Sequence, residues 1–293
     1  MPEIKEIKKA IFPIAGLGTR FLPLSKVVSK EFFPLADKPM IQYTIDEAVA
    51  FGIKKIVFII SPGQKGILEY FKKNPKLEKI LKERKNEIFL NELEKIQEIS
   101  KRISFSFVVQ KEPLGDGQAI LLAKNMINKE PTAVFFSDDI IDSEKSCLSQ
   151  LNQLFKTSQA PIIALKKISP ERRLFYGLVE AEKIASRIYK IKRIIEKPSE
   201  DTTLSELTVV GRYIITPEVF EYLKKVSPAK GGEIRLSGAL AKMIKDGKIV
   251  YGYEIDGEWL ECGNKLSWLK SHLYLSLKHK EFGPELKKYL KTL

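Results

Sequence analysis

The sequence predicts an α/β fold in which a mixed, mostly parallel sheet is flanked by helices and joined to a smaller β-rich half. Apolar runs at residues 9–15 and 55–61 are each followed by a helical pattern, which is the rhythm of βα units. Beyond residue 160 the apolar runs are shorter and follow one another, as antiparallel strands do. These two observations predict one architecture with two unlike halves.

The first half contains the most continuous apolar runs. Residues 9–15 lead into the glycines of residues 16–18, which predicts a buried strand followed by a Gly-rich loop. Apolar residues between positions 41 and 49 recur at helical spacing and predict the next helix. Pro75 is expected to open one long charged helix that includes Ile96. Two further strands are expected at residues 103–109 and 133–136.

The second half has weaker patterns. Its strands are expected at residues 161–165, 177–179, 189–195 and 207–215. The final forty residues return to helical spacing. Since no Pro/Ser/Gly-rich linker and no internal repeat interrupts the chain, we expect residues 1–293 to form a single domain, in which 1–160 and 161–265 are the halves and 266–293 are C-terminal helices.

The charge balance suggests a polyanionic partner. Fifty basic and thirty-seven acidic side chains give a net charge of +13. Most of the excess lies in residues 72–102, with ten basic and six acidic side chains, and in residues 265–293, with seven and two. Acidic residues are interleaved in both, which is typical of solvated helix faces, so we expect no nucleic-acid binding. The two cysteines, Cys147 and Cys262, give no zinc-finger spacing and no disulfide framework.

The expected location is cytoplasmic. The first six residues are charged and lack the apolar run of a signal peptide. No stretch approaches the roughly 18 apolar residues of a membrane span, so no membrane association is expected.

The Gly-rich loop is a candidate phosphate site. Backbone N–H groups of such loops approach phosphate oxygens, and Thr19 and Arg20 follow Gly18 directly. Lys30 lies ten residues further on and adds a second cation. The loop is neither a dinucleotide fingerprint nor a Walker A motif, because Phe21 replaces the third glycine and no Gly-Lys-Ser/Thr follows. A Gly-x-Gly pair alone is equally compatible with a tight turn.

Three consecutive blocks carry a family resemblance. They are AGLGTRFLP at residues 15–23, SKEFFP at 29–34 and DKPMIQY at 37–43. In this respect the chain resembles the sugar-1-phosphate nucleotidyltransferases, and among them the bacterial UTP–glucose-1-phosphate uridylyltransferases. The resemblance extends over residues 8–290. It implies a Rossmann-like nucleotidyltransferase fold with a nucleotide-binding first half and a sugar-phosphate-binding second half.

The resemblance also implies the reaction and its site. A sugar phosphate attacks the α-phosphorus of UTP and pyrophosphate leaves, with glucose 1-phosphate as the sugar substrate, Mg²⁺ as the cofactor and a homo-oligomer as the assembly. By position, the phosphate-binding cations are Arg20 and Lys30 and the metal ligand is Asp138. The nucleotide-binding residues are Ala15, Gly16, Leu17, Gly18, Thr19, Glu31, Gln110 and Gly115, and the sugar-phosphate-binding residues are Gly177, Glu196, Lys197 and Val210.

Two of these assignments have independent chemical support. The Gln110 amide offers a donor and an acceptor, which match N3–H and O4 of uracil or thymine equally well. Asp138 follows an apolar strand, and Mg²⁺ prefers one or two carboxylate ligands together with substrate phosphates. Asp139 is expected to face the opposite side of the strand.

The chain departs from the family pattern at four positions. Gly238 stands where relatives have an aspartate near a second metal position, so we expect a single protein-held Mg²⁺ at Asp138. Gln118 replaces a histidine, Asp116 an apolar residue and Glu261 an aspartate. Either acidic replacement restores a carboxylate to the site if it lies nearby.

Two alternatives remain open from the sequence. Thymidylyltransferases share the Gly-Thr-Arg and Lys-Pro features, although they have Lys-Gln where this chain has Lys30-Glu31 and lack the long charged segment. A non-catalytic sugar-nucleotide-binding protein is the other alternative, motivated by Gly238 and opposed by the presence of Arg20 and Asp138.

Overall fold

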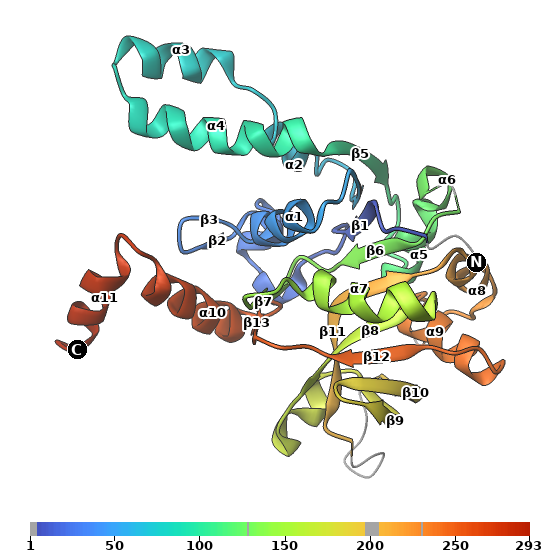
Figure 1. The fold of residues 1–293 in the computed structure, drawn as a ribbon. Coiled ribbons are helices and arrows are strands. Elements are labelled where there is room, and N and C mark those ends of the chain that lie inside the picture. The colour runs from blue at the N-terminus through green and yellow to red at the C-terminus, as the bar shows by residue number, and fades with distance from the viewer. Residues whose placement is uncertain (1–4, 128, 197–204, 230) are drawn as a thin grey trace.

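The computed structural model describes residues 5–127, 129–196, 205–229 and 231–293. A nine-stranded sheet with the order β5-β4-β1-β6-β11-β8-β12-β10-β9 runs through the molecule (Figure 1). Its strands are β1 (Lys9–Pro13), β4 (Lys55–Ile60), β5 (Ser104–Val109), β6 (Thr132–Phe135), β8 (Ile162–Lys167), β9 (Leu178–Ala185), β10 (Ile188–Ile195), β11 (Leu207–Ile215) and β12 (Tyr251–Glu254).

The four strands expected in the first half are confirmed as β1, β4, β5 and β6. They are parallel to one another, and the interiors of β1, β4 and β6 are buried on both faces. Their apolar residues pack against helices on each side of the sheet, which is why these strands read as continuous apolar runs. On one face lie α1 (Met40–Phe51) and α7 (Cys147–Ser158), and on the other lie α5 (Asp116–Leu122), α8 (Pro217–Lys225) and α9 (Leu236–Lys245).

The second half is mostly antiparallel, as expected. β11 pairs antiparallel with β6 and β8, and β10 pairs antiparallel with β9 and β12, while β12 is parallel to β8. β11 thereby joins the two halves into one sheet. Two small sheets complete the fold, β7 (Asp139–Asp142) with β13 (Glu258–Glu261) and β2 (Pro34–Leu35) with β3 (Lys38–Pro39).

The prediction of one long charged helix is wrong. The segment forms two helices, α3 (Pro75–Glu83) and α4 (Glu87–Arg102), which stand out beyond the β5 edge (Figure 1). The chain reverses at Lys85, whose φ is 53°, and Asn86 caps α4 by accepting a hydrogen bond from the Phe89 N–H. All charged side chains there except the half-buried Glu78 are exposed, as expected for solvated helix faces.

The C-terminal segment is helical only from Lys265 onward. α10 (Lys265–Lys278) and α11 (Gly283–Leu290) extend away from the sheet (Figure 1), whereas residues 258–261 form β13 instead of the expected helix. The short helices are α2 (Gly66–Tyr70) and α6 (Lys124–Ile127), with 3-10 turns at Thr19–Phe21, Leu24–Lys26, Lys30–Phe32 and Pro170–Phe175. Within the described ranges, no helix combines the length and apolar character that crossing a membrane requires.

Candidate active site

A cleft of about 580 Å³ opens where β6 ends, at the carboxyl edge of the parallel strands. Its walls come from the loop after β1, the β6–β7 junction, the Pro170–Phe175 turn with the start of β9, and β13. Segments from both halves of the chain thus meet at one place. The lining residues are Arg20, Phe136, Asp138, Asp139, Leu174, Phe175, Tyr176, Gly177, Glu196, Val209, Trp259, Glu261 and Gly263.

Lys30 and Asp138 form an ion pair beside the cleft. Lys30 Nζ lies 2.6 Å from Asp138 Oδ2, and each side chain is 18% exposed. Burial acts to raise the pKa of Asp138, but the charge and hydrogen bond of Lys30 outweigh it and lower the pKa below its ordinary value. The structure therefore brings together a cation and a carboxylate that are 108 residues apart in the sequence, and both are charged at neutral pH.

Gly263 marks the point where three charged groups converge. A Cβ atom built on it would lie 3.3 Å from Asp138 Oδ2, 3.4 Å from Arg20 Nη1 and 3.6 Å from Glu261 Oε1. The lack of a side chain leaves this space open to a ligand. Two carboxylates and one guanidinium that face the same space are suited to a phosphate group with a divalent cation.

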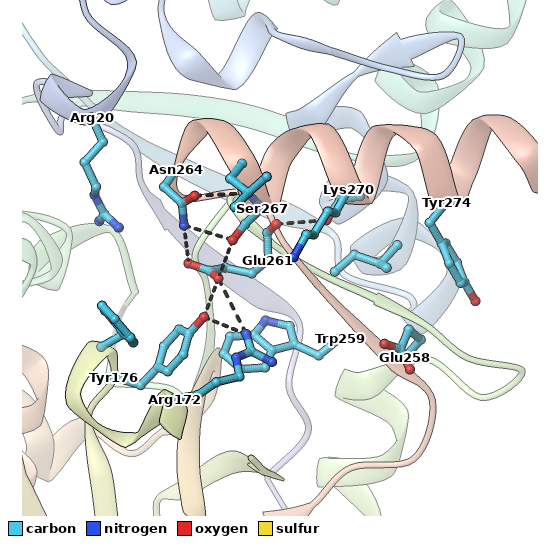
Figure 2. Close-up of a pocket in the computed structure, with 14 residues that line it drawn as sticks. Arg20, Arg172, Tyr176, Glu258, Trp259, Glu261, Asn264, Ser267, Lys270 and Tyr274 are labelled. Atoms are coloured by element: carbon cyan, nitrogen blue, oxygen red, sulfur yellow. Dashed lines mark hydrogen bonds and ion pairs between the residues drawn. The ribbon is translucent and has the colours of Figure 1, made fainter. Parts of the chain in front are cut away.

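Glu261 is held in place by several donors (Figure 2). Its Oε2 accepts hydrogen bonds from the Tyr176 hydroxyl and from Ser267 Oγ at 3.0 Å, and its Oε1 accepts one from Asn264 Nδ2 at 3.2 Å. Arg172 Nη2 lies 3.8 Å from the same carboxylate. The sequence had marked Glu261 as one of two acidic replacements that could restore a carboxylate to the site, and its place in the cleft follows from the pairing of β13 with β7.

The donor set fits Mg²⁺. Asp138 and Glu261 supply carboxylate oxygens, and Mg²⁺ usually takes only one or two protein carboxylates with the remaining positions filled by phosphates and water. Over the residues that the structure describes, no group of three or more His, Cys, Asp or Glu side chains could form a metal cage of its own. A metal at this cleft would therefore depend on substrate oxygens.

Gly238 lies away from these carboxylates. It lines a separate cavity of about 130 Å³ together with Val226 and Ala241, and a Cβ there would meet Val226 Cγ2 at 3.3 Å. Asp116 does not line the cleft itself: it lines an adjoining cavity with Gly177 and Glu196, and its carboxylate accepts a 2.7 Å hydrogen bond from the Leu236 N–H. Of the two replacement carboxylates considered from the sequence, it is Glu261 that faces Asp138.

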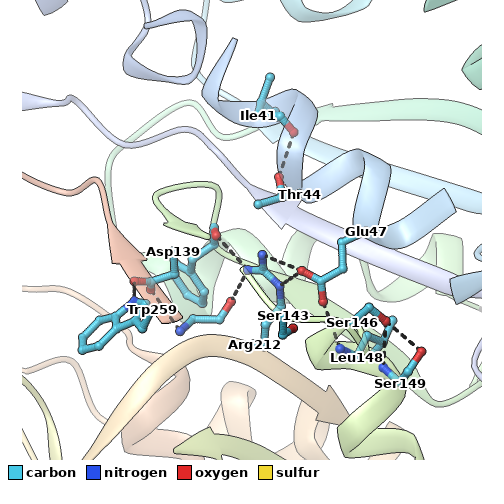
Figure 3. A network of polar contacts seen from close by, with 12 residues as sticks. Ile41, Thr44, Glu47, Asp139, Ser143, Ser146, Leu148, Ser149, Arg212 and Trp259 are labelled. Atoms are coloured by element: carbon cyan, nitrogen blue, oxygen red, sulfur yellow. Dashed lines mark hydrogen bonds and ion pairs between the residues drawn. The ribbon is translucent and has the colours of Figure 1, made fainter. Parts of the chain in front are cut away.

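Asp139 lines the cleft together with Asp138 and connects three strands (Figure 3). Its Oδ1 accepts a 2.6 Å hydrogen bond from Trp259 Nε1 on β13, and its Oδ2 accepts one of 3.0 Å from the Gly211 N–H on β11. A Cβ on Gly211 would lie 2.4 Å from that oxygen, so glycine permits the close approach. Burial raises the pKa of Asp139 to about 7.

A buried ion pair lies behind this contact (Figure 3). Arg212 is 1% exposed, and its Nε and Nη2 each lie 3.0 Å from Glu47 Oε2 on α1. Its Nη1 donates to the carbonyl oxygens of Phe136 and Gly211 at 3.0 Å each. The network fixes the turn that presents Asp138, and nothing in the sequence pattern distinguishes Arg212 from a surface arginine.

The expected phosphate loop is accessible. Gly16, Leu17 and Thr19 are exposed, while Ala15 is buried at the end of the strand segment. Gly18 adopts the left-handed conformation with φ 62°, and its carbonyl accepts a 2.8 Å hydrogen bond from Ser25 Oγ. A Cβ on Gly16 would meet no atom within 4 Å, so a ligand can approach the backbone there.

The expected base-binding residues are buried and already hydrogen-bonded. Glu31 is 1% exposed and accepts from the Ser29 hydroxyl and from Gln64 Nε2 at 3.3 Å. Burial raises the pKa of Glu31. Gln110 Nε2 donates to the Gly115 carbonyl at 3.0 Å and to Gln118 Oε1 at 2.6 Å. Gln118, which the sequence marked only as a departure, thus holds the Gln110 amide in place.

The expected sugar-binding residues lie at the other end of the cleft. Gly177 and Glu196 line both the cleft and an adjoining cavity of about 170 Å³. The side chain of Val210 packs in the hydrophobic core, and its neighbour Val209 lines the cleft, because side chains alternate along β11. Val210 can therefore reach a ligand only through its backbone. Lys197 lies outside the residues that the structure describes.

The comparisons with known proteins agree with one another. Residues 9–276 match the nucleotidyl transferase family. The chain is 36% identical over 291 residues to the UTP–glucose-1-phosphate uridylyltransferase of Bacillus subtilis, covering 99% of this chain and 98% of that protein. It is 37% identical over 290 residues to the enzyme of the same name from Staphylococcus haemolyticus, with 99% of both chains covered.

Solved structures give the same result. The UTP-bound UGPase from Acinetobacter baumannii superposes with a TM-score of 0.89 at 33% identity, covering 98% of this chain and 100% of that one. A UDP-glucose pyrophosphorylase complexed with UDP-glucose superposes with a TM-score of 0.84 at 34% identity, covering 94% and 100%. A glucose-1-phosphate thymidylyltransferase structure from Bacillus anthracis, at 21% identity and a TM-score of 0.70, shares the fold.

Proposed function

This chain belongs to the nucleotidyl transferase family, and we propose that its cleft transfers the uridylyl group of UTP to glucose 1-phosphate, giving UDP-glucose and pyrophosphate. The observation that carries the proposal is the convergence of Asp138, Glu261 and Arg20 around Gly263, between a phosphate loop and a sugar-sized cavity. Full-length identity of 36% and 37% to uridylyltransferases favours UTP over dTTP.

The reaction forms one P–O bond and breaks another. A phosphate oxygen of glucose 1-phosphate attacks the α-phosphorus, and the bond to the bridging oxygen of pyrophosphate breaks with its electron pair. The phosphate is already a competent nucleophile, so no general base is needed. The two histidines agree with this, since His272 lies against the Pro34 carbonyl and His279 beside Asp37, and neither lines the cleft.

The fixed cations stabilise the charge that develops. Arg20 reaches the space around Gly263, and Lys30 is held beside it by Asp138. Preorganised cations of this kind are most effective in a partly desolvated site. Nucleotidyl transferases of this type generally use a divalent metal, and Asp138 with Glu261 would hold Mg²⁺, which would neutralise phosphate charge when bound.

The two substrates occupy different parts of the site. The Gly16–Gly18 backbone, with Ala15 and Thr19 at its ends, wraps the triphosphate, while Gln110, Gly115 and Glu31 bind the base. Gly177, Glu196 and the Val210 backbone bind the sugar, and Lys197 binds its phosphate. The assembly is a cytoplasmic homo-oligomer. Support for self-association comes from exposed apolar side chains on the C-terminal helices, Leu266, Leu269, Leu273 and Tyr289.

The test is nucleotide-dependent pyrophosphate release. The protein is incubated with glucose 1-phosphate, Mg²⁺ and each nucleoside triphosphate in turn. Release with UTP is expected. A preference for dTTP would replace the proposal by thymidylyl transfer, and UTP binding without any release would indicate a non-catalytic sugar-nucleotide-binding protein.

A further inference from the structure

The two carboxylate oxygens of Glu261 have different surroundings. A Cβ on Gly263 would lie 3.6 Å from Oε1, in the space that the Asp138 carboxylate also faces. The other oxygen, Oε2, accepts hydrogen bonds from the Tyr176 hydroxyl and, at 3.0 Å, from Ser267 Oγ. Because Oε2 is anchored by these two donors, the direction in which Oε1 points is fixed.

Anchoring is needed because a glutamate side chain is flexible. It has three rotatable bonds, one more than the aspartate of the family pattern at this position. Each bond must be fixed before the Glu261 carboxylate holds a constant position beside Asp138, and fixing it costs conformational entropy. Hydrogen bonds from the surrounding donors offset that cost before a ligand arrives. The side chain is 12% exposed, and hydrogen bonds in such a partly desolvated environment are stronger than in water.

The first turn of α10 determines where the Ser267 hydroxyl proton points. Asn264 is the N-cap of α10, and its Oδ1 accepts a 3.0 Å hydrogen bond from the Ser267 N–H. Its Nδ2 therefore faces the other way and donates to Ser267 Oγ at 2.9 Å and to Glu261 Oε1 at 3.2 Å. A hydroxyl has a single proton, and because Ser267 Oγ accepts from Asn264, that proton is left for Glu261 Oε2. The helix cap and the carboxylate thus form one hydrogen-bonded unit (Figure 2).

Asn264 and Ser267 lie behind Glu261 and not in the cleft. Both line a separate cavity of about 800 Å³ between β13 and α10, and neither lines the catalytic cleft, whereas Glu261 lines both spaces. Ser271, one turn further along α10, holds the same residue from the backbone side, since its Oγ donates to the Glu261 carbonyl oxygen at 2.8 Å. The effect of Ser267 on a ligand in the cleft therefore passes through Glu261.

We propose that Ser267 is a positioning residue for the metal site: its hydroxyl, oriented by Asn264, holds Glu261 Oε2 so that Oε1 faces the same space as Asp138. The proposal rests on the Mg²⁺-assisted uridylyl transfer proposed above, and it adds the first turn of α10 to the parts of the chain that the reaction needs. Each carboxylate oxygen has two lone-pair sites, so Oε1 can accept the bond from Asn264 and still bind a cation.

The test measures how much Mg²⁺ strengthens UTP binding. UTP is titrated calorimetrically with and without Mg²⁺, in the absence of glucose 1-phosphate, so that no turnover is needed. Ser267→Ala should reduce the gain in affinity about tenfold, as the loss of a partner around a metal-binding carboxylate does, while metal-free UTP binding changes less than about twofold. Ser267→Thr keeps the hydroxyl and should retain most of the gain. Ser276→Ala is the matched control, because Ser276 is a buried serine of the same helix that lines neither the cleft nor the cavity behind Glu261.

A second variant shows whether Ser267 acts through the carboxylate. Glu261→Ala removes that group, so Ser267→Ala should cause no further loss of the gain in this background, because both changes remove the same interaction. Additive losses would overturn the proposal. An unchanged gain in Ser267→Ala, or a loss that Ser276→Ala reproduces, would also overturn it.

Failure of the proposed function is a separate result. If the wild-type protein releases no pyrophosphate from UTP and glucose 1-phosphate, uridylyl transfer fails, and a Mg²⁺-dependent gain that Ser267→Ala reduces would support the positioning role alone. If Mg²⁺ gives the wild type no gain in UTP affinity, the positioning role fails. Ser267→Ala keeps the N–H that Asn264 caps, so the variant should keep the wild-type melting temperature.

Discussion

Replacing Glu47 by alanine should destabilise the protein strongly. The substitution leaves the Arg212 guanidinium, 1% exposed, without the carboxylate that lies 3.0 Å from its Nε and Nη2. It also removes the acceptor for the Leu148 N–H, which bonds Glu47 Oε1 at 2.9 Å at the start of α7. Removal of one partner of a buried ion pair costs about 3–5 kcal/mol, because the remaining charge stays buried.

The assay is urea unfolding followed by far-ultraviolet circular dichroism. Glu47→Ala should lower the free energy of unfolding by about 3–5 kcal/mol. Glu69→Ala is the control, because it breaks an ion pair with Lys72 in which both side chains are more than 60% exposed. That change should cost less than about 1 kcal/mol. Equal losses in the two variants would refute the view that the Arg212 network supports the cleft.

Three further substitutions follow from the geometry. Gly263→Ala places a methyl group where the two carboxylates and the Arg20 guanidinium converge. Turnover should therefore fall at least tenfold, while the melting temperature stays within about 2 °C of the wild-type value. Unchanged turnover would show that ligands do not use this space. Gly115→Ala should destabilise the protein and weaken nucleotide binding, measured by thermal shift and calorimetry, because φ is +95° and its Cβ would lie 2.4 Å from the Ile234 carbonyl oxygen. Burial raises the pKa of Asp116 to about 6, above its value in the unfolded chain. The stability that the protonated Asp116 contributes is therefore fully present below the unfolded-state pKa and is lost as pH rises through about 6. The Asp116→Asn variant should therefore have a higher melting temperature than wild type at pH 7.5 but not at pH 4.5. A difference in melting temperature that does not depend on pH would contradict the assignment of this effect to the buried Asp116 carboxylate.

The strands could be predicted from the sequence where consecutive residues are all buried. β1 and β4 read directly from the sequence because both faces of these strands are covered by helices. The division of the charged segment into α3 and α4 could not be predicted from the apolar pattern. Apolar spacing persists on both sides of Lys85, and the reversal depends on one left-handed residue and a capping asparagine.

The site could be predicted only where a motif is local. The Gly-rich loop and Lys30 stand within one short stretch, and the resemblance named Asp138. Glu261 reaches Asp138 through the antiparallel pairing of β13 with β7, a contact between distant segments that no local pattern encodes. The choice between Val209 and Val210 depends on strand phase, which the bulge in β11 between Val210 and Tyr213 makes hard to predict.

The most direct test of uridylyl transfer at this cleft is phosphorus NMR of a mixture of UTP, glucose 1-phosphate and Mg²⁺ with wild type and with Asp138→Ala. Wild type should convert UTP into UDP-glucose and pyrophosphate in equal amounts. Asp138→Ala should lose at least 100-fold in rate, about 2.7 kcal/mol of transition-state stabilisation, and should still bind UTP. Formation of UDP-glucose by Asp138→Ala at the wild-type rate, with saturating Mg²⁺, would contradict the account.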